Sequence, residues 1–220
     1  MTQYSKKLAH LFDATQCVGC SACIVACAQT NYPDMLNDEN TGWKSLPSNI
    51  RVVKLETLRR PQQILVQCQQ CEDAPCVHVC PTGASYRDAD GKVLVDKEKC
   101  IGCKYCMMAC PYGVRSWNTK EKAVEKCTLC GQLTAADQEP ACVAACCANA
   151  RFYGDLDDPQ SDAAQAVAAA DAKSLHTLKD VGNKPLTQYI LSEKIAAWHD
   201  VDEITPASDA ADAAWFTKEA

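Results

Sequence analysis

The cysteines of this 220-residue chain constrain its fold more than any other feature. Four of the 17 lie in the segment C-I-G-C-K-Y-C-M-M-A-C-P at residues 100–111. In this C-x2-C-x2-C-x3-C-P spacing, three closely spaced thiolates hold one [4Fe–4S] cluster, and the fourth points away and can hold a second cluster. Gly102 eases the turn between the first thiolates, and Pro111 redirects the chain after the last. The segment therefore predicts a partner segment elsewhere in the chain.

Three further segments have four cysteines each in a related spacing. The second has two extra residues in its loop, and the fourth has eleven residues between its middle cysteines. In chain order, motifs one to four comprise Cys17, Cys20, Cys23 and Cys27; Cys68, Cys71, Cys76 and Cys80; Cys100, Cys103, Cys106 and Cys110; and Cys127, Cys130, Cys142 and Cys146. Sixteen ligands at four per cluster predict four [4Fe–4S] clusters and leave Cys147 over.

The order of the motifs favours a nested pairing, in which motifs two and three exchange their fourth cysteines and motifs one and four do likewise. The predicted ligand sets are Cys17/Cys20/Cys23/Cys146, Cys127/Cys130/Cys142/Cys27, Cys68/Cys71/Cys76/Cys110 and Cys100/Cys103/Cys106/Cys80. We therefore expect an α+β fold with two ferredoxin-like lobes in residues 1–160. Residues 161–220 are expected to form a C-terminal helical extension and an acidic tail.

Other uses of sixteen thiols fit the pattern less well. A structural zinc site needs two cysteine pairs and no fourth cysteine followed by proline. Disulfides require export and are poorly served by an odd number of clustered cysteines. A cluster that activates a substrate needs an iron with an open position, and every predicted set is complete. The pattern indicates single-electron transfer rather than catalysis.

Charge and hydropathy limit the partners of the chain. The formal charge is −6, and four oxidised clusters with their thiolates, at about −2 each, would bring it to roughly −14. So acidic a protein is a poor binder of nucleic acid or anionic membranes. Residues 1–16 contain no apolar signal-peptide core, and no apolar run is long enough to span a bilayer. We expect no direct membrane insertion, so a partner would have to provide any anchor.

Alternation and turn residues predict short strands between the motifs. They lie at residues 7–15, 50–55, 63–67, 84–87, 92–95, 114–118, 123–126 and 150–153. Helices are expected from Cys20 to about Gln29 and over residues 161–173, the latter capped by Ser161. Residues 31–49, including Trp43, are expected to form a surface loop, residues 186–200 a last short element and residues 202–220 the tail.

The sequence resembles a known family over residues 8–160. The resemblance rests on C-E-D-A-P-C-V-H-V-C-P-T-G-A at 71–84, C-I-G-C-K-Y-C-M-M-A-C-P-Y-G at 100–113, E-K-C-T-L-C at 125–130 and G-D-L-D-D-P at 154–159. These segments are similar to the four-cluster electron-transfer subunits of the dimethyl sulfoxide reductase family of molybdenum and tungsten enzymes. The resemblance implies a large catalytic partner with a molybdenum or tungsten bis-pterin cofactor and usually a further cluster. In many members it also implies a membrane subunit that handles quinol. It also implies the nested pairing of motifs.

Two positions depart from the pattern of some relatives. Motif three keeps all four cysteines, so we expect a [4Fe–4S] rather than a [3Fe–4S] cluster there. Cys147 stands where the fourth motif usually has proline. The spacing favours Cys146 as the ligand and leaves Cys147 as a buried spare thiol or an alternative ligand.

Several side chains beside the motifs could influence the clusters. Lys104 either raises a cluster potential or is merely solvated. His78 could in principle bind iron, although a helix residue with another partner is the preferred interpretation. Trp117 and Tyr112 are expected to pack against clusters and exclude water.

These observations predict a non-catalytic subunit that relays single electrons between a molybdenum or tungsten catalytic subunit and either a membrane quinol-handling subunit or a soluble donor. The alternatives are the beta subunit of a hydrogenase or formate dehydrogenase, a free polyferredoxin and, more remotely, a zinc-stabilised structural module. We expect a prokaryotic complex on the outer (periplasmic) face of the membrane, reached by co-export with the partner, with a cytoplasmic complex as the alternative.

Overall fold

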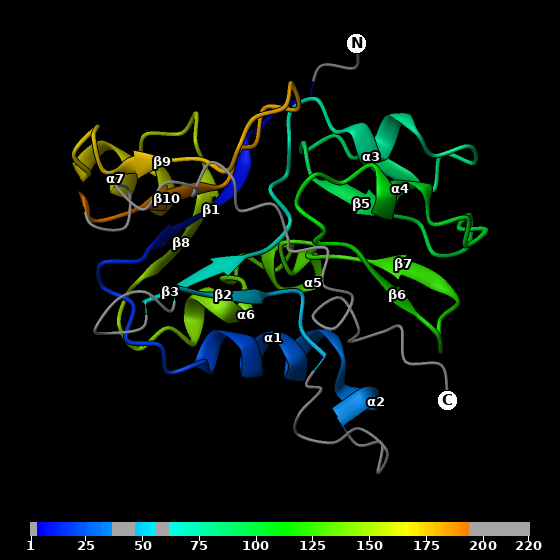
Figure 1. Ribbon diagram of the computed structural model, residues 1–220, viewed down its shortest axis with the longest axis horizontal. Coiled ribbons are helices and arrows are strands. Elements are labelled where there is room, and N and C mark those ends of the chain that lie inside the picture. The colour runs from blue at the N-terminus through cyan, green and yellow to red at the C-terminus, as the bar shows by residue number, and fades with distance from the viewer. Residues whose placement is uncertain (1–3, 37–46, 56–61, 194–220) are drawn as a thin grey trace.

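The computed structural model describes residues 4–36, 47–55 and 62–193. Short helices and strands alternate along the chain, and most cysteines lie in the loops between them (Figure 1). The strands are β1 (Leu8–Asp13), β2 (Arg51–Leu55), β3 (Gln62–Val66), β4 (Ser85–Arg87), β5 (Val93–Val95), β6 (Ser116–Asn118), β7 (Ala123–Glu125), β8 (Arg151–Asp155), β9 (Leu175–His176) and β10 (Gln188–Ile190). The helices are α1 (Ala22–Asn31), α2 (Pro33–Leu36), α3 (Pro75–His78), α4 (Tyr105–Met108), α5 (Gly131–Thr134), α6 (Ala141–Ala144) and α7 (Asp162–Ala169).

One four-stranded sheet joins distant parts of the chain in the order β8-β1-β10-β9. β1 is buried along its whole length, as expected for a strand with neighbours on both edges. It pairs antiparallel with β8 and parallel with β10, so that Leu11 lies opposite both Phe152 and Gln188. Sequence alternation predicted β1 and β8, but β9 and β10 come from the expected C-terminal extension.

The other strands form three separate antiparallel hairpins, β2-β3, β4-β5 and β6-β7. All six strands lie where alternation and turn residues predicted them. The β4-β5 turn contains Gly91 at φ +91°, where a Cβ atom would come within 2.3 Å of the Lys6 carbonyl oxygen. The Ser5 amide donates to the Ala89 carbonyl of the same turn, so the start of the chain lies against it.

Four helices carry the cysteine motifs, and the third cysteine is the second residue of each helix: Cys23 in α1, Cys76 in α3, Cys106 in α4 and Cys142 in α6. α1 is longer than the other three, and it continues past Cys27, where Ala28 stands in place of the proline that follows Cys80 and Cys110. α3 and α4 end before Cys80 and Cys110, where the following proline disfavours helical geometry at the cysteine.

The motif helices gather in two groups. α1 lies beside α6, and α3 lies beside α4 on another side of the molecule (Figure 1). This is the grouping of motifs one with four and two with three. One apolar core cluster includes Phe12, Ile64 and Tyr189 together with cysteines from all four motifs, so the thiols form part of the hydrophobic interior.

The described part of the extension contains α7, β9 and β10. Ser161 caps α7 as predicted, with its side-chain oxygen accepting from the Ala164 amide. No helix within the described ranges is long and apolar enough to cross a membrane. Trp43, residues 194–200 of the expected last element and the tail at 202–220 lie outside the described residues.

Candidate iron–sulfur sites

The same backbone turn presents the first three cysteines in motifs one and three. Gly19 and Gly102 have φ of 70° and 71° between the first and second cysteine. Ser21 and Lys104, directly after the second cysteine, both have φ 62° and ψ 8° and begin the motif helix. Glycine adopts positive φ without the Cβ penalty of other residues. The near-identical angles wrap two unrelated stretches of sequence into one local shape.

A second repeated turn follows the fourth cysteine of motifs two, three and four. The carbonyl of the fourth cysteine accepts a hydrogen bond from the amide three residues later, on Gly83, Gly113 or Asn149. All three residues have positive φ, of 66°, 55° and 48°. Asn149 replaces glycine because asparagine tolerates the left-handed conformation better than most residues. The turn brings later amides back to the sulfur.

Four thiols from motifs one and four line a single cavity. Its wall contains Cys17, Cys20, Cys23 and Cys146, which form one of the predicted ligand sets. Apolar side chains, including Phe12 and Leu65, and the buried Arg151 complete the lining. A set of thiols in an apolar enclosure suits a cofactor that must be shielded from water.

The second set of this lobe is buried more deeply. Cys27, Cys127, Cys130 and Cys142 are all buried. The Asn31 side-chain amide lies 3.6 Å from Cys27 Sγ and 3.7 Å from Cys130 Sγ, so one donor reaches both sulfurs. Burial, opposed by nearby hydrogen bonds and supported by the Cys142 and Cys130 thiolates, raises the pKa of Cys27 to about 11.

The other lobe brings Cys110 among the first three cysteines of motif two. Burial, together with the thiolates of Cys68, Cys110 and Cys76, raises the pKa of Cys71 to about 12. A hydrogen bond of 2.9 Å from Asn183 Nδ2 to Cys71 Sγ opposes this shift. Metal binding would displace the protons that these buried thiols hold.

The last set contains the motif-three cysteines and Cys80. Burial raises the pKa of Cys106, and the Cys80 thiolate is among the neighbours that raise it further. Cys100 and Cys103 precede α4 in the wrapped turn described above. Cys103 is exposed, as is Cys20 in motif one, whereas Cys68, Cys71, Cys127 and Cys130 are buried. One set in each lobe is therefore closer to the surface.

Backbone amides also donate to the sulfurs. The Ser85 amide lies 3.3 Å from Cys80 Sγ, and the Ala150 amide lies 3.3 Å from Cys146 Sγ. Burial raises the pKa of Cys80, but hydrogen bonds from Ser85 and Thr82 outweigh it and lower the pKa below its ordinary value. Such N–H···S bonds are a means by which proteins adjust cluster potentials.

The motif-flanking residues have mixed outcomes. Cys147 is exposed, so the expectation of a buried thiol is wrong; its Sγ lies 3.9 Å from Cys20 Sγ. His78 is exposed and its Nε2 lies 2.6 Å from Asp73 Oδ1, which confirms that it has a partner other than iron. Tyr112 is buried, with its hydroxyl bonded to Asn183 and to the Lys179 carbonyl.

Trp117 and Lys104 lie together beside motif three. Lys104 Nζ is 5.0 Å from the centre of the Trp117 ring, and the lysine side chain is exposed. The Trp117 ring also packs on Gly102, where a Cβ atom would come within 2.8 Å of it. The indole thus covers the turn that carries Cys100 and Cys103.

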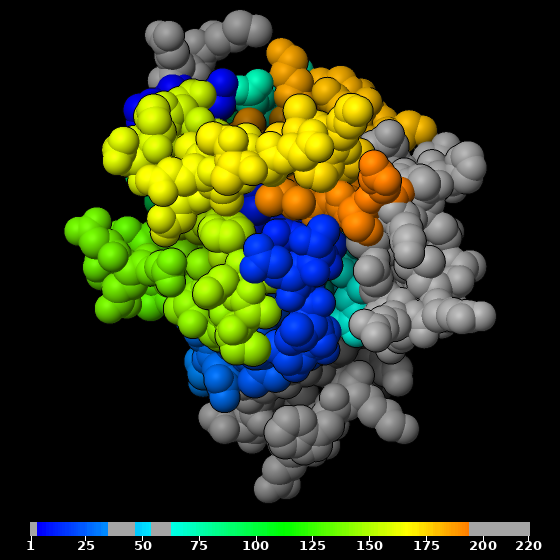
Figure 2. All heavy atoms as spheres, turned by 90° about the vertical axis from the view of Figure 1, so that its left-hand side faces the viewer, coloured from blue at the N-terminus to red at the C-terminus, as the bar shows by residue number. Residues whose placement is uncertain are grey.

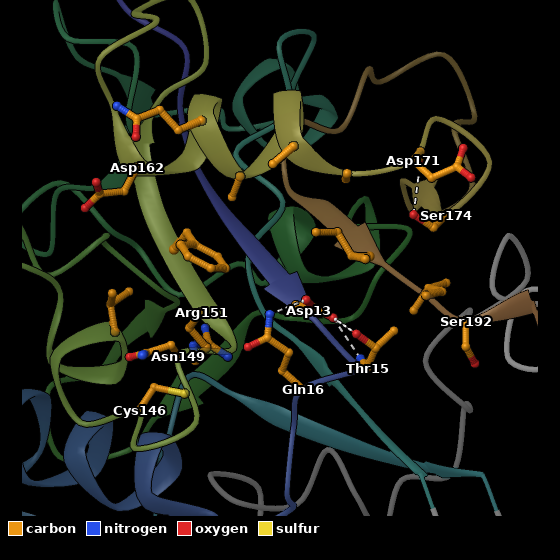
Figure 3. Close-up of a pocket in the computed structure, with 18 of the residues that line it drawn as sticks. Asp13, Thr15, Gln16, Cys146, Asn149, Arg151, Asp162, Asp171, Ser174 and Ser192 are labelled. Atoms are coloured by element: carbon orange, nitrogen blue, oxygen red, sulfur yellow. Dashed lines mark hydrogen bonds between the residues drawn. The ribbon is translucent and has the colours of Figure 1, made fainter.

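An open hollow of about 840 Å³ borders the fourth motif (Figure 3). Figure 3 shows Cys146, Asn149 and Arg151 together in its wall. Asp13 lies at its edge and accepts from the Thr15 amide and hydroxyl, which fixes the chain just before motif one. On the face in Figure 2, the yellow residues of the α7 segment lie above the larger of the two blue patches, which belongs to the N-terminal part of the chain.

Three contacts to the sulfurs could not have been predicted by local reasoning. Asn183 reaches Cys71 from the C-terminal extension. Arg115 Nη2 lies 2.9 Å from Cys76 Sγ, and the Cys142 and Cys23 thiolates are close enough to raise the pKa of Arg151, against its burial. The available signal was the recurrence of arginine five residues after the fourth cysteine of motifs three and four.

The described residues fit [4Fe–4S] clusters by the chemistry of their donors. The predicted ligands are all thiols, and amide and guanidinium N–H groups surround them. Within the described ranges, no three His, Cys, Asp or Glu side chains converge closely enough to hold a single metal ion. A cubane of four irons and four sulfides is larger than one ion, and its ligands are correspondingly further apart.

Comparison with known proteins agrees with this chemistry. Two models of the 4Fe-4S dicluster domain match residues 62–156 and 16–84, and together they span all four motifs. These matches confirm [4Fe–4S] clusters and ferredoxin-like domains. The number of clusters and the individual ligands stay predictions.

Several curated proteins are similar over most of the chain. One subunit of the sulfite dehydrogenase of Allochromatium vinosum is 40% identical over 216 residues, which cover 90% of this chain and 89% of that protein. The thiosulfate reductase electron transfer subunit PhsB of Salmonella typhi is 43% identical over 73% of this chain and 82% of its own length. One chain of the polysulfide reductase of Wolinella succinogenes is 37% identical, with coverage of 82% and 92%.

Proposed function

Because this protein belongs to the iron–sulfur electron-transfer subunits of the dimethyl sulfoxide reductase family of molybdopterin oxidoreductases, we propose that it relays single electrons along four [4Fe–4S] clusters. Its partners would be a large catalytic subunit with molybdenum or tungsten and either a membrane quinol-handling subunit or a soluble donor. The observation that carries the proposal is the cavity lined by Cys17, Cys20, Cys23 and Cys146. It supports the exchange of fourth cysteines that makes each pair of motifs a two-cluster lobe.

The four sets would form a single file. Burial raises the pKa of Cys106, and the Cys76 thiolate raises it further. The Cys106 set would therefore be a neighbour of the Cys76 set. The Cys68 thiolate likewise contributes to the raised pKa of Cys127, where burial is again the largest cause. Burial raises the pKa of Cys23, and the Cys142 thiolate raises it further. Since Cys142 belongs to the Cys127 set and Cys23 to the Cys17 set, these two sets would also be neighbours. Buried sets would therefore lie in the middle, and the sets with exposed Cys103 and Cys20 would lie at the two ends.

The residues of this chain would hold and tune the clusters. Each bound [4Fe–4S] cluster supplies a one-electron redox site. The thiols provide its ligands, the apolar walls exclude water, and the N–H donors on Asn31, Asn183, Ser85 and Ala150 stabilise the negative charge on sulfur. Because every predicted set is complete, no iron keeps an open position for a substrate.

The location of the complex is part of the proposal. We place it on the outer face of a prokaryotic membrane, with export of the folded protein by a partner that carries the signal. Protease treatment of spheroplasts under anaerobic conditions tests this location. Digestion supports the outer face, and protection until lysis supports the cytoplasmic alternative.

The decisive experiment is anaerobic isolation of the native complex, with metal analysis and identification of the co-purifying chains. We expect a brown complex with a large partner containing molybdenum or tungsten. Each copy of this chain should contribute about sixteen irons, in addition to the iron of any cluster in the partner. A nickel–iron partner would indicate a hydrogenase subunit, and formate oxidation by the complex a formate dehydrogenase subunit. Iron without any partner would leave a free polyferredoxin, and a colourless zinc protein would overturn the proposal.

A further inference from the structure

Two buried arginines occupy equivalent positions in the two lobes. Arg115 is the fifth residue after Cys110, and Arg151 is the fifth residue after Cys146. Their exposed fractions are 5% and 3%. The repeated turn after the fourth cysteine brings each of them back into the lobe, just before or at the start of a strand.

Arg115 lies between the two predicted ligand sets of its lobe. Its Nη2 is 2.9 Å from Cys76 Sγ and 2.9 Å from Ser85 Oγ. Cys76 belongs to one predicted set. In the other set, burial raises the pKa of Cys106, and Arg115 is close enough to oppose that shift. Its Nη1 is buried and has no hydrogen-bond partner among the described residues.

Arg151 occupies the corresponding place in the other lobe. It lines the cavity with Cys23 and Cys146. Although burial opposes the shift, the Cys142 thiolate of the second set is also close enough to raise the pKa of Arg151. One guanidinium nitrogen, Nη2, donates to Gln67 Oε1. The remaining two nitrogens, Nε and Nη1, are buried and unpartnered within the described ranges.

A third buried cation provides a contrast. Lys126 donates to the carbonyls of Val93 and Cys127, so its ammonium group is held by the backbone. Neither arginine has a carboxylate within ion-pair distance among the described residues, and both leave N–H donors unused. A buried charge without a partner is costly, and N–H groups this deep are normally bonded. An anionic cluster on each side would supply both the opposite charge and the missing acceptors.

We propose that Arg115 and Arg151 each bridge the two clusters of one lobe and raise the reduction potentials of both. The inference rests on the proposed function, because it requires two clusters in each lobe. The planar guanidinium directs its five N–H donors along fixed, different directions, which suits one cation shared between two acceptors. A nearby positive charge favours the reduced, more negative cluster.

A shared arginine would shift the reduction potentials of the two clusters in one lobe in the same direction, so their difference would stay small. When one electron moves from one cluster of a lobe to the other, it stays beside the same guanidinium. Arginine remains protonated throughout, so the step moves an electron and no proton. The two lobes can then be tuned separately, each through its own arginine.

The test is a redox titration of the intact, anaerobically purified complex, followed by electron paramagnetic resonance. The variants are Arg115→Gln and Arg151→Gln, and the matched control is Lys104→Gln, which removes an exposed cation beside motif three. We expect each arginine variant to shift two titration components to more negative potential, by at least tenfold in the reduction equilibrium constant, or about 59 mV. The two variants should shift different pairs, and the control should shift none by that amount.

Each outcome bears on one claim. Wild-type complex without iron–sulfur signals would refute the proposed function itself. Normal signals and iron content, with potentials unchanged in both arginine variants, would refute only the bridging role. If a glutamine variant loses its iron, the Arg→Lys variant decides, since lysine keeps the charge and lacks the fork. A shift confined to one pair of components then supports the bridging role. Wild-type potentials would show that a charge without the fork is sufficient, and they would overturn the bridging role.

Discussion

Adjacent residues in motif four have different environments. Cys146 lines both the thiol cavity and the neighbouring hollow, and its sulfur accepts from the Ala150 amide. Cys147 is exposed, and its sulfur lies near that of Cys20. The spacing of the motif favours Cys146 as the predicted ligand, and Cys147 lies beside the predicted set that contains Cys20.

The two cysteines therefore make a matched pair of variants. We expect Cys146→Ser to lose about four of sixteen irons per chain, because one cluster loses a ligand. Cys147→Ser should keep the full iron content and serves as the control. Iron and sulfide analysis of the purified complex measures both. Retention of all iron by Cys146→Ser, together with its loss from the Cys146→Ser/Cys147→Ser double variant, would reassign the ligand to Cys147.

Asn183 links a distant loop to motif two and to Tyr112 through two hydrogen bonds, to Cys71 Sγ, a predicted ligand, and to the Tyr112 hydroxyl. In Asn183→Ala both buried acceptors lose a donor, so we expect a loss of about 1–3 kcal/mol in the free energy of unfolding. The exposed Val181→Ala, in the same loop, is the control and should change it little. Anaerobic denaturant titration followed by the visible absorbance measures the difference. Equal midpoints for the two variants would show that the amide contributes nothing.

At the scale of elements, local sequence predicted what local interactions determine. The hairpins and α7 follow from alternation, turn residues and the Ser161 cap, whereas the cysteine sets stay a prediction from spacing. β10 was not predicted as a strand because its partner, β1, lies at the other end of the chain. The recurrence of arginine five residues after the fourth cysteine marks Arg115 and Arg151 as equivalent positions, but it does not by itself show that both are buried.

The wrapped turn of motif three gives a prediction at this scale. Gly102 and Gly83 have similar positive φ, but a Cβ atom at Gly102 would lie 2.8 Å from the Trp117 ring, whereas Gly83 has open space around it. Gly83→Ala should therefore cost only the backbone strain, about 1–2 kcal/mol. Gly102→Ala should cost more, because the indole must also move. The rate of iron release to a chelator compares the two, and equal rates would mean that Trp117 does not constrain the turn.

At the scale of the whole molecule, residues 161–193 are integrated with the cluster-binding part. β10 pairs in parallel with β1. The amides of Leu186 and Thr187 donate to the Gln69 carbonyl, and the Asn183 side chain donates to Cys71 Sγ. Gln69 lies between two cysteines of motif two. The predicted boundary at residue 160 thus separates segments that share a sheet and a ligand environment.

Truncation tests whether this integration matters for the clusters. A chain that ends at residue 160 loses β10 and every contact from the extension to motif two, so we expect it to lose iron first from the Cys68/Cys71/Cys76/Cys110 set. A chain that ends at Glu193 keeps all of these contacts and should retain its iron when produced with its partner. Because thiolate ligation and folding are coupled, the shorter chain should also unfold at lower denaturant concentration. Full iron content in the shorter chain would mean that the four motifs alone hold their clusters, and that the extension only covers them.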